Sequence, residues 1–144
     1  MRKILIASLL AMAAASRPAH AAGDPVTVEN YYRIRWGSGT EFGKLFQKNE
    51  LPVLNEMRRL GFIRSFQIER PFTHMEGGPR WDYRVRITYR DADAGVVSNG
   101  AYDEAEEQAI KRLFKNTATR DREEIRRFEL MDAHWDVFVM PVSE

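Results

Sequence analysis

The sequence predicts an α+β fold in which strands and helices follow the order strand, helix, strand, strand, split helix, strand. Three observations predict it. Apolar and polar side chains alternate in four segments, apolar side chains recur at helical spacing in two longer ones, and stretches rich in glycine, proline or asparagine separate them. A chain of 144 residues is long enough for one domain with one core.

The first 21 residues are predicted to be an export signal that does not belong to the fold. Two basic residues precede the apolar run 4–15, and Ala19-His20-Ala21 fits the small-x-small rule for cleavage. The run is shorter than the roughly 20 apolar residues of a spanning helix. We expect cleavage after Ala21, which leaves residues 22–144 as one periplasmic or secreted domain with no membrane anchor. The alternative, an uncleaved signal anchor, is disfavoured because Arg17-Pro18 ends the apolar run.

Charge and cysteine content exclude several classes of protein. Cleavage removes three of the 22 basic residues and none of the 21 acidic ones, so the mature chain has a formal net charge of −2. This balance gives no electrostatic reason to expect nucleic acid or an anionic membrane as a partner. The chain has no cysteine, which excludes disulfides, thiolate metal sites and a cysteine nucleophile.

The first strand is expected over 27–36, and a helix follows it. Arg33 and Arg35 fall on one parity of the strand, and its apolar side chains fall on the other. These apolar side chains are Val28, Tyr32, Ile34 and Trp36. After a break at 37–40, apolar residues at helical spacing predict a helix over 42–60. Pro52 lies inside it and predicts a kink or a restart near residues 49–51.

The next two strands are expected over 62–69 and 81–89, with a loop rich in turn-forming residues between them. In the second strand Phe62, Phe66 and Ile68 share the apolar parity. Ile63 falls on the polar side, together with Ser65, Gln67 and Glu69. The third strand alternates most regularly, which is typical of a strand with one face in a core and the other against polar surroundings.

The last elements are a split helix and a closing strand. Apolar spacing predicts a helix over 101–114, and Asn116-Thr117-Ala118-Thr119 interrupts it. A further helical piece is expected to start at Asp121 with a capping box and to bury Ile125 and Phe128. The closing strand is expected over 134–142.

This order of elements is that of the ferredoxin-like split βαβ fold, a four-stranded antiparallel sheet with helices on one face only. The polar parities of the four strands would then form the outer face. That predicted face carries Arg33, Arg35, Ser65, Gln67, Glu69, Arg84, Arg86, Thr88, His134, Asp136 and Phe138.

The chain resembles the dimeric α+β barrel superfamily, which includes cofactor-free monooxygenases, stress-response barrel proteins and small ring-modifying enzymes. The resemblance rests on element order and on three segments, at residues 31–36, 46–63 and 134–139. It implies that two sheets face each other across a homodimer. In the enzymes of this superfamily, a cavity between sheet and helices holds the ligand. Because the fold hosts many functions, it does not supply one.

His134 and Asp136 are the first candidates for catalysis. On a strand they would share one face with side chains roughly 7 Å apart, and a carboxylate near a histidine can orient it as a base. The alternative is a histidine in a structural polar network. His74, in the loop, is either a solvated residue or a lid contact. The histidines show no metal-ligand spacing, so we predict neither a metal nor a cofactor.

Arginines and pocket residues are the candidates for binding. Four arginines on one sheet face, Arg33, Arg35, Arg84 and Arg86, suit carboxylates, either of a ligand or of Glu69, Asp82 and Asp136 in the same or a facing sheet. We favour a face turned toward a second subunit. The predicted ligand-binding residues are Asn49, Tyr83, Trp36, Arg84 and Arg86.

Three functions therefore remain open. The first is a dimeric barrel that binds a small hydrophobic or aromatic molecule. The second is a cofactor-free oxygenase, isomerase or lyase with His134 or His74 as the base, and the third is a structural or interaction protein. A closed apolar cavity with one of those histidines pointing into it would favour the enzyme.

Overall fold

A computed structural model describes residues 23–97, 100–140 and 142. The export signal and the predicted cleavage site after Ala21 lie outside the described residues. Within the described part of the chain, no helix has the length and apolar character that crossing a membrane requires.

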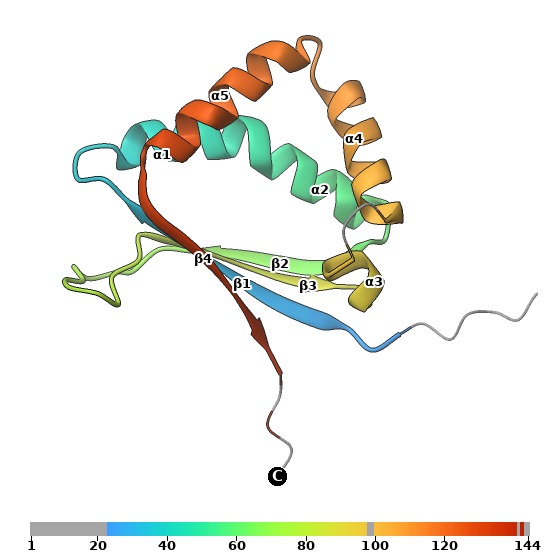
Figure 1. The fold of residues 1–144 in the computed structure, drawn as a ribbon, viewed down its shortest axis with the longest axis horizontal. Coiled ribbons are helices and arrows are strands. Elements are labelled where there is room, and N and C mark those ends of the chain that lie inside the picture. The colour runs from blue at the N-terminus through green and yellow to red at the C-terminus, as the bar shows by residue number, and fades with distance from the viewer. Residues whose placement is uncertain (1–22, 98–99, 141, 143–144) are drawn as a thin grey trace, which may run out of the picture.

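The sheet contains four strands, β1 (Val26–Ile34), β2 (Ile63–Glu69), β3 (Tyr83–Tyr89) and β4 (Met131–Val139). Their order is β2-β3-β1-β4, and every neighbouring pair is antiparallel. The helices lie on one face of this sheet (Figure 1). The predicted ferredoxin-like α+β architecture is therefore confirmed, with strand ends that differ from the predicted ones by a few residues.

The first helical region consists of three consecutive segments, α1 (Gly39–Leu45), the π-helix η1 (Phe46–Glu50) and α2 (Leu51–Arg59). Pro52 lies at the start of α2 and has no N–H to donate to the carbonyl of Lys48. The irregularity predicted near residues 49–51 is thus a π-helical turn that runs directly into α2. A π-helical turn inside an α-helix is frequent at functional sites.

The second helical region is split as predicted. A short helix α3 (Ala92–Gly95) follows β3, and α4 (Ala101–Leu113) and α5 (Thr117–Glu129) follow it. The predicted start of the last helix at Asp121 was wrong. The helix begins one turn earlier because the side chain of Asn116 accepts a hydrogen bond from the Thr119 amide at 2.9 Å and caps it there.

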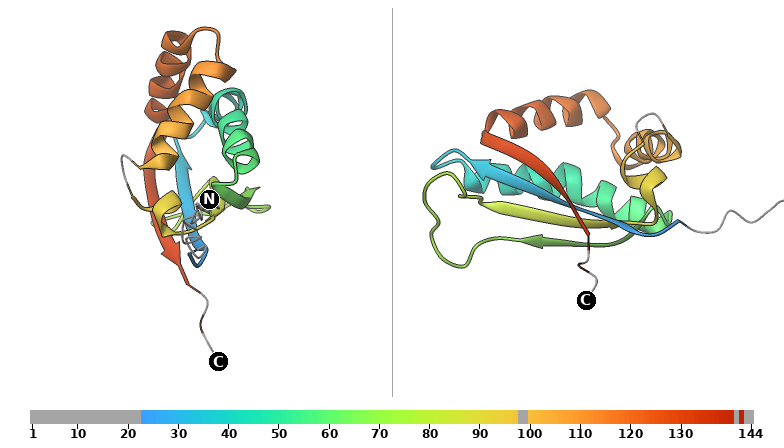
Figure 2. Two further views of the ribbon diagram at one scale, coloured as in Figure 1. Left: turned by 90° about the vertical axis from the view of Figure 1, so that its right-hand side faces the viewer. Right: turned by 60° about the horizontal axis from the view of Figure 1, so that its bottom comes forward.

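The helices lie over one face of the sheet, as the two views in Figure 2 show, and the core residues come from both layers. The aromatic part of the core is formed by Tyr32 and Tyr83 from the sheet and by Phe42 and Phe46 from the first helical region. The ring centroids of neighbouring members lie 5.1–6.3 Å apart. Further buried members are Ile34, Val53, Leu54, Met57, Ile63, Val85, Ile87, Ala109, Leu130 and Met131.

The predicted orientation of β4 was wrong. His134, Asp136 and Phe138 lie on the helix-facing side, because they pair with Tyr32, Asn30 and Val28 of β1 and directly paired residues share a face. Trp135, Val137 and Val139 take the outer side. β4 is an edge strand, and its helix-facing side is only partly covered, so polar side chains are accommodated there.

Ile63 was also assigned to the wrong face. A register shift between Ile63 and Ser65 makes Ile63 the partner of Tyr89, and its side chain is buried in the core. The extra residue of this bulge is Arg64, which remains exposed and donates a hydrogen bond to the Arg90 carbonyl at 3.1 Å. The bulge therefore explains why a charged residue interrupts the apolar pattern of this strand.

The buried side of α5 differs from the predicted one. Ile125 and Phe128 are 63% and 51% exposed, whereas Arg127 is only 3% exposed. The helix therefore buries a cation where apolar spacing predicted two apolar side chains. The partners of this cation define the candidate site.

Candidate functional site

Arg127 is a buried cation held by two carboxylates. Its Nη2 donates to Oε2 of Glu124 at 2.6 Å and to Oε2 of Glu50 at 3.3 Å, and its Nε donates to Glu124 at 3.1 Å. A carboxylate paired in this way satisfies most of the requirement of a buried guanidinium for hydrogen bonds. Glu124 lies on the same helix, and Glu50 is the last residue of the π-helix η1.

Aromatic rings surround the same guanidinium. Its Cζ lies 4.9 Å from the ring centre of Phe128 and about 6 Å from those of Tyr32, Phe42 and Phe46. Such rings attract a cation through their quadrupoles. The remaining nitrogen, Nη1, is buried and has no hydrogen-bond partner among the described residues. One donor of a fixed cation is therefore unpaired in an aromatic environment.

His134 lies next to these rings, on the helix-facing side of β4. Its ring centre is 4.5 Å from that of Tyr32 and 6.2 Å from that of Phe128. Its Nε2 lies 3.4 Å from Oδ1 of Asp136. Burial lowers the pKa of His134, the Asp136 carboxylate raises it, and the Arg127 cation lowers it, with a net lowering from 6.5. The imidazole is therefore mainly neutral at pH 7 and can accept a proton.

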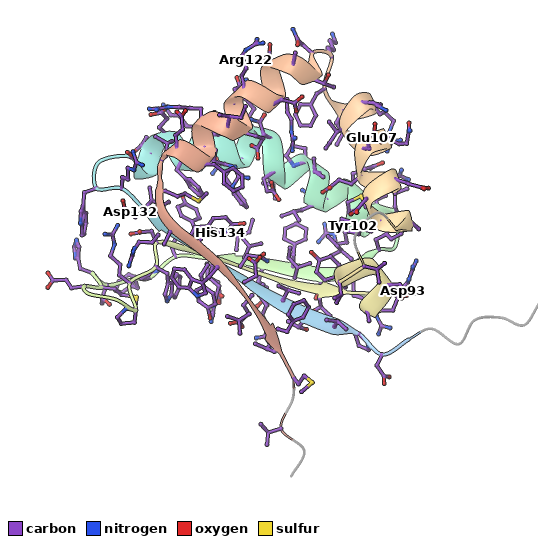
Figure 3. The ribbon with its side chains drawn as sticks, viewed as in Figure 1. Asp93, Tyr102, Glu107, Arg122, Asp132 and His134 are labelled. Atoms are coloured by element: carbon purple, nitrogen blue, oxygen red, sulfur yellow. The ribbon has the colours of Figure 1, made fainter. Side chains whose placement is uncertain are left out.

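Several further ionisable groups lie between the sheet and the helices. Burial raises the pKa of Glu50 and of Glu106. Burial also raises the pKa of Tyr89 to about 12 and that of Tyr102 further. Figure 3 shows His134 on β4 and Tyr102 on α4, both lying between the sheet and the helices. This side of the sheet therefore combines aromatic rings with ionisable groups whose charged forms are disfavoured by burial.

The predicted ligand-binding residues do not form one site. Asn49 and Tyr83 are buried on the helix-facing side of the sheet. Trp36 is 71% exposed, because β1 ends at Ile34 and the chain then turns. The guanidinium of Arg80 stacks on its ring at 4.1 Å. The predicted inward position of Trp36 was therefore wrong.

Arg84 and Arg86 are on the outer face as predicted, but their partners lie within the same sheet. Arg84 contacts Glu69 at 2.6 Å and Glu29 at 3.7 Å, and Arg86 contacts Glu29 at 3.7 Å. The prediction had included Glu69 and had missed Glu29. The other two predicted carboxylates are engaged elsewhere, since Asp82 pairs with Arg80 and Asp136 is on the opposite face.

The four arginines do not converge on one point. Nη1 of Arg33 donates to the Gly78 carbonyl at 3.5 Å, and Nε of Arg35, which lies beyond the end of β1, is 3.8 Å from Asp132. Each of the four guanidinium groups therefore has its own nearby partner. The arrangement does not form an anion site from all four.

The outer face carries an aromatic stack that the sequence prediction missed. The ring of Tyr31 stacks on Trp135 at 5.3 Å and meets Trp81 edge-on at 5.9 Å. The Tyr31 hydroxyl donates to Glu29 at 2.5 Å. Val137 lies on the same face and is 40% exposed. The face is therefore a mixture of ion pairs and apolar groups, although Ile63 and Phe138, which were predicted to supply the apolar part, lie on the other side.

His74 lies in the exposed loop between β2 and β3 and lines a surface pocket of about 200 Å³ with Trp36, Phe72 and Trp81. His134 does not line this pocket, so the two histidines belong to separate places on the molecule. Among the described residues, no three histidine or carboxylate side chains cluster in a way that would hold a metal ion.

The comparison with known proteins supports the fold. No family model and no curated protein matches the sequence. The structure is similar to a NIPSNAP family protein from Agrobacterium tumefaciens, with 16% sequence identity and a TM-score of 0.50 over 85% of this chain and 90% of the other. At this identity the similarity shows the fold alone.

Two further solved structures are more distant. A DABB family protein with a ferredoxin-like fold from Mesorhizobium loti is 10% identical, with a TM-score of 0.46 over 83% of this chain and 98% of the other. A dimeric protein of unknown function with a ferredoxin-like fold from Bacteroides fragilis is 10% identical, with a TM-score of 0.44 and the same coverage. The antiparallel order of the four strands and the similarity to the NIPSNAP family protein both indicate a ferredoxin-like α+β fold. The resemblance predicted from the sequence is therefore confirmed at the level of the fold.

Proposed function

We propose that this protein is an exported homodimeric domain that binds a small aromatic molecule on the helix-facing side of its sheet, beside His134. The observation that carries the proposal is the unpaired Nη1 of Arg127, a side chain that shares the rings of Tyr32 and Phe128 with the mainly neutral His134. Aromatic side chains with a few well-placed polar groups are typical of sites for small molecules.

The charges indicate the kind of polar group that the ligand carries. Glu124 already balances the charge of Arg127, so Nη1 is available as a hydrogen-bond donor more than as a free charge. A neutral acceptor such as a ketone oxygen suits this donor better than an anion. A ligand would approach between β4, where His134 and Asp136 are partly exposed, and Phe128 of α5, which is 51% exposed.

The binding proposal can be tested with acetophenone and ethylbenzene, which differ in the carbonyl oxygen. NMR titration of the mature protein should show saturable shifts at His134 and Phe128 with acetophenone, and binding at least 10-fold weaker with ethylbenzene. Phe128→Ala should weaken binding, whereas Phe72→Ala, which removes an exposed aromatic ring from the loop between β2 and β3, should not. Equal affinity for the two molecules would contradict the proposed role of Arg127.

A second candidate function is acid–base catalysis without a cofactor. It is favoured by the contact of 3.4 Å between a mainly neutral His134 and Asp136, with the cation of Arg127 nearby. His134 would take a proton from the carbon next to a ketone, and Nη1 of Arg127 would stabilise the resulting enolate oxygen. The imidazolium of His134 exchanges its proton with solvent and returns one proton to the carbon, which restores the neutral histidine.

This second candidate predicts exchange of the acetophenone methyl protons with deuterium in D₂O. The wild-type protein should accelerate the exchange, and His134→Gln should abolish the acceleration. His74→Gln is the matched control, because His74 lies in the other pocket. If acetophenone binds but its methyl protons do not exchange, the catalytic candidate is refuted and the protein is a binding protein.

The proposed homodimer uses the outer face of the sheet. Tyr31, Trp135 and Val137 give this face an apolar part that suits a subunit contact better than bulk solvent. Val137→Arg should therefore yield a monomeric mass in light scattering, and the new cation would lie opposite Glu29 within its own sheet. Phe138→Arg, on the opposite face of the same strand, should remain a dimer. A wild-type monomer at micromolar concentration would refute the dimer.

Export remains a proposal that rests on residues 1–21. N-terminal sequencing of protein recovered outside the cytoplasm should find a start at Ala22 or within a residue or two of it. The third possibility, a structural or interaction protein, is less favoured, because Arg84 and Arg86 already have carboxylate partners within their own sheet.

A further inference from the structure

A second pocket, separate from the surroundings of His134, lies between η1 and the turn that joins α4 to α5. It has a volume of about 250 Å³. Leu113 and Phe114 provide its apolar wall, and Asn49, Thr119, Arg120 and Glu123 are among its polar lining residues. This volume is slightly below the roughly 300–1,000 Å³ of typical ligand pockets, so the pocket suits only a small molecule.

Asn49 supplies an unpaired acceptor. Its side chain is fully buried, its Nδ2 donates to Oε2 of Glu123 at 3.1 Å, and its Oδ1 has no partner among the described residues. Rotating the amide would not help, because it would turn the carbonyl oxygen toward the Glu123 carboxylate. A buried acceptor without a hydrogen bond is costly to the folded state. The side chain is therefore suited to receive a donor from outside the chain.

Arg120 supplies an unpaired donor in the lining of the same pocket. Its Nε is buried and has no partner among the described residues. The guanidinium Cζ lies 6.0 Å from the ring centre of Phe114, and Nη1 is 3.5 Å from Asp121. These two contacts hold the guanidinium against the apolar wall. One fixed donor and one fixed acceptor thus belong to the lining of one small pocket.

The surrounding charges favour an anionic ligand. The ammonium of Lys48 is neutralised by Glu123 at 2.6 Å. Lys115 also lines the pocket, is exposed, and makes no ion pair within the described part of the chain. Because Arg120 is itself paired with Asp121, Lys115 is the cation that attracts an anion to the pocket.

We propose that this pocket binds a small 2-hydroxy carboxylate with an apolar substituent. The carboxylate accepts from Nε of Arg120, the hydroxyl donates to Oδ1 of Asn49, and the substituent packs on Leu113 and Phe114. A hydroxyl that satisfies a buried acceptor gives strong selectivity, because an analogue without it leaves that acceptor unpaired. The site uses neither His134 nor Arg127 and is independent of the proposed function.

The test compares mandelate with phenylacetate, which lacks only the hydroxyl. In an NMR titration of the mature protein, mandelate should give saturable shifts at Thr119 and Arg120 with a millimolar or lower Kd. Phenylacetate should bind at least 10-fold more weakly. Equal affinity for the two acids, or no saturable shift with mandelate, would overturn the proposal. This comparison needs no variant and does not depend on whether a mutant folds.

Variants then test the two polar groups. Arg120→Met should weaken mandelate binding at least 10-fold and affect phenylacetate similarly, since both acids carry the carboxylate. Asn49→Leu should weaken mandelate binding and leave phenylacetate unchanged. Arg126→Met is the matched control on the same helix, because Arg126 pairs with Glu41 and does not line the pocket. A loss of mandelate binding in Arg126→Met as large as that in Arg120→Met would also overturn the proposal.

Discussion

The hydroxyl of Tyr83 lies 2.7 Å from the position that a Cβ atom of residue 43 would occupy. Gly43 is a buried residue of α1, and Tyr83 is a buried residue of β3. The absence of a side chain at position 43 therefore allows the helix to approach the sheet closely at this point. The next nearest atom, Cζ of Tyr83, is at an ordinary contact distance of 3.8 Å.

This relationship predicts opposite effects of Gly43→Ala in two backgrounds. In the wild type, the clash with a buried and poorly adjustable ring should destabilise the fold by about 1–3 kcal/mol, despite the better helix propensity of alanine. In Tyr83→Phe the clash is gone, so the same change should stabilise by up to about 1 kcal/mol. Urea unfolding of the four proteins in the cycle measures both values, and equal effects in the two backgrounds would rule out the clash.

The lowered pKa of Glu56 should make the stability of the protein depend on pH in the acid range. Hydrogen bonds from Arg59 at 2.7 Å, together with the nearby cation of Arg112, lower the pKa of Glu56 from 4.5 to about 2. A carboxyl group with a lowered folded pKa adds stability above its unfolded pKa, and this stability is lost as pH falls from 4.5 toward 2. Glu56→Gln should flatten the pH dependence of the unfolding midpoint in that window.

The two arginines should contribute unequally to this effect. Arg59→Met should raise the pKa of Glu56 more than Arg112→Met does, because the hydrogen bond from Arg59 is its largest cause. The pKa can be followed by NMR of the Glu56 carboxyl carbon. A larger shift in Arg112→Met would show that the contact between α2 and α4 outweighs the pair within α2.

We expect Arg127→Met to lower the free energy of unfolding strongly. The change leaves the partly buried carboxylates of Glu124 and Glu50 without their cation, which typically costs about 3–5 kcal/mol. Adding Glu124→Gln to this variant should recover part of the loss, because one unpaired charge is removed. Denaturant unfolding at pH 7 provides the comparison. A loss below about 1 kcal/mol would mean that the pair behaves as a surface salt bridge.

The titration of His134 provides a direct test of its environment. Burial lowers its pKa below 6.5, and Asp136 partly opposes this effect. The imidazole should therefore titrate below pH 6.5 in NMR, and Asp136→Asn should lower its pKa further. Asp132→Asn is the control, because Asp132 pairs with Arg35. Stability contributed by the neutral imidazole is present above pH 6.5 and should be lost as pH falls from 6.5 through the lowered pKa.

The sequence was sufficient to predict the fold because most elements have a regular period. β3 alternates strictly and β1 does so except at Asn30 and Tyr31, and their pairing reproduces the predicted faces. β4 also alternates, but its apolar parity, which includes Trp135 and Val137, lies on the outer face, so the alternation predicted the wrong orientation. Its face is set by the register with β1, which includes a shift between Arg33 and Ile34 that a single strand pattern does not reveal.

The candidate site was only partly predictable, for a similar reason. The proximity of His134 and Asp136 follows from their spacing, and the structure places them 3.4 Å apart. Arg127 has no such local signal, because one of two neighbouring arginines on a helix looks like a solvated residue. Its burial depends on Glu50 and Phe46, which are about 80 residues away along the chain and are oriented by a π-helical turn. A helical wheel with a period of 3.6 residues places that segment incorrectly.

The position of β1 between β3 and β4 has a consequence for how the chain folds. The first strand is central in the sheet, yet one of its two neighbours is the last element of the domain. Until β4 is available, one edge of β1 is open and can pair with another extended chain. Contacts so distant in sequence also slow folding, because a long loop must close before they form. A chain interrupted before residue 131 would therefore leave one edge of β1 unpaired, and other chains could aggregate by pairing with it. By pairing with this edge, β4 protects β1 from aggregation.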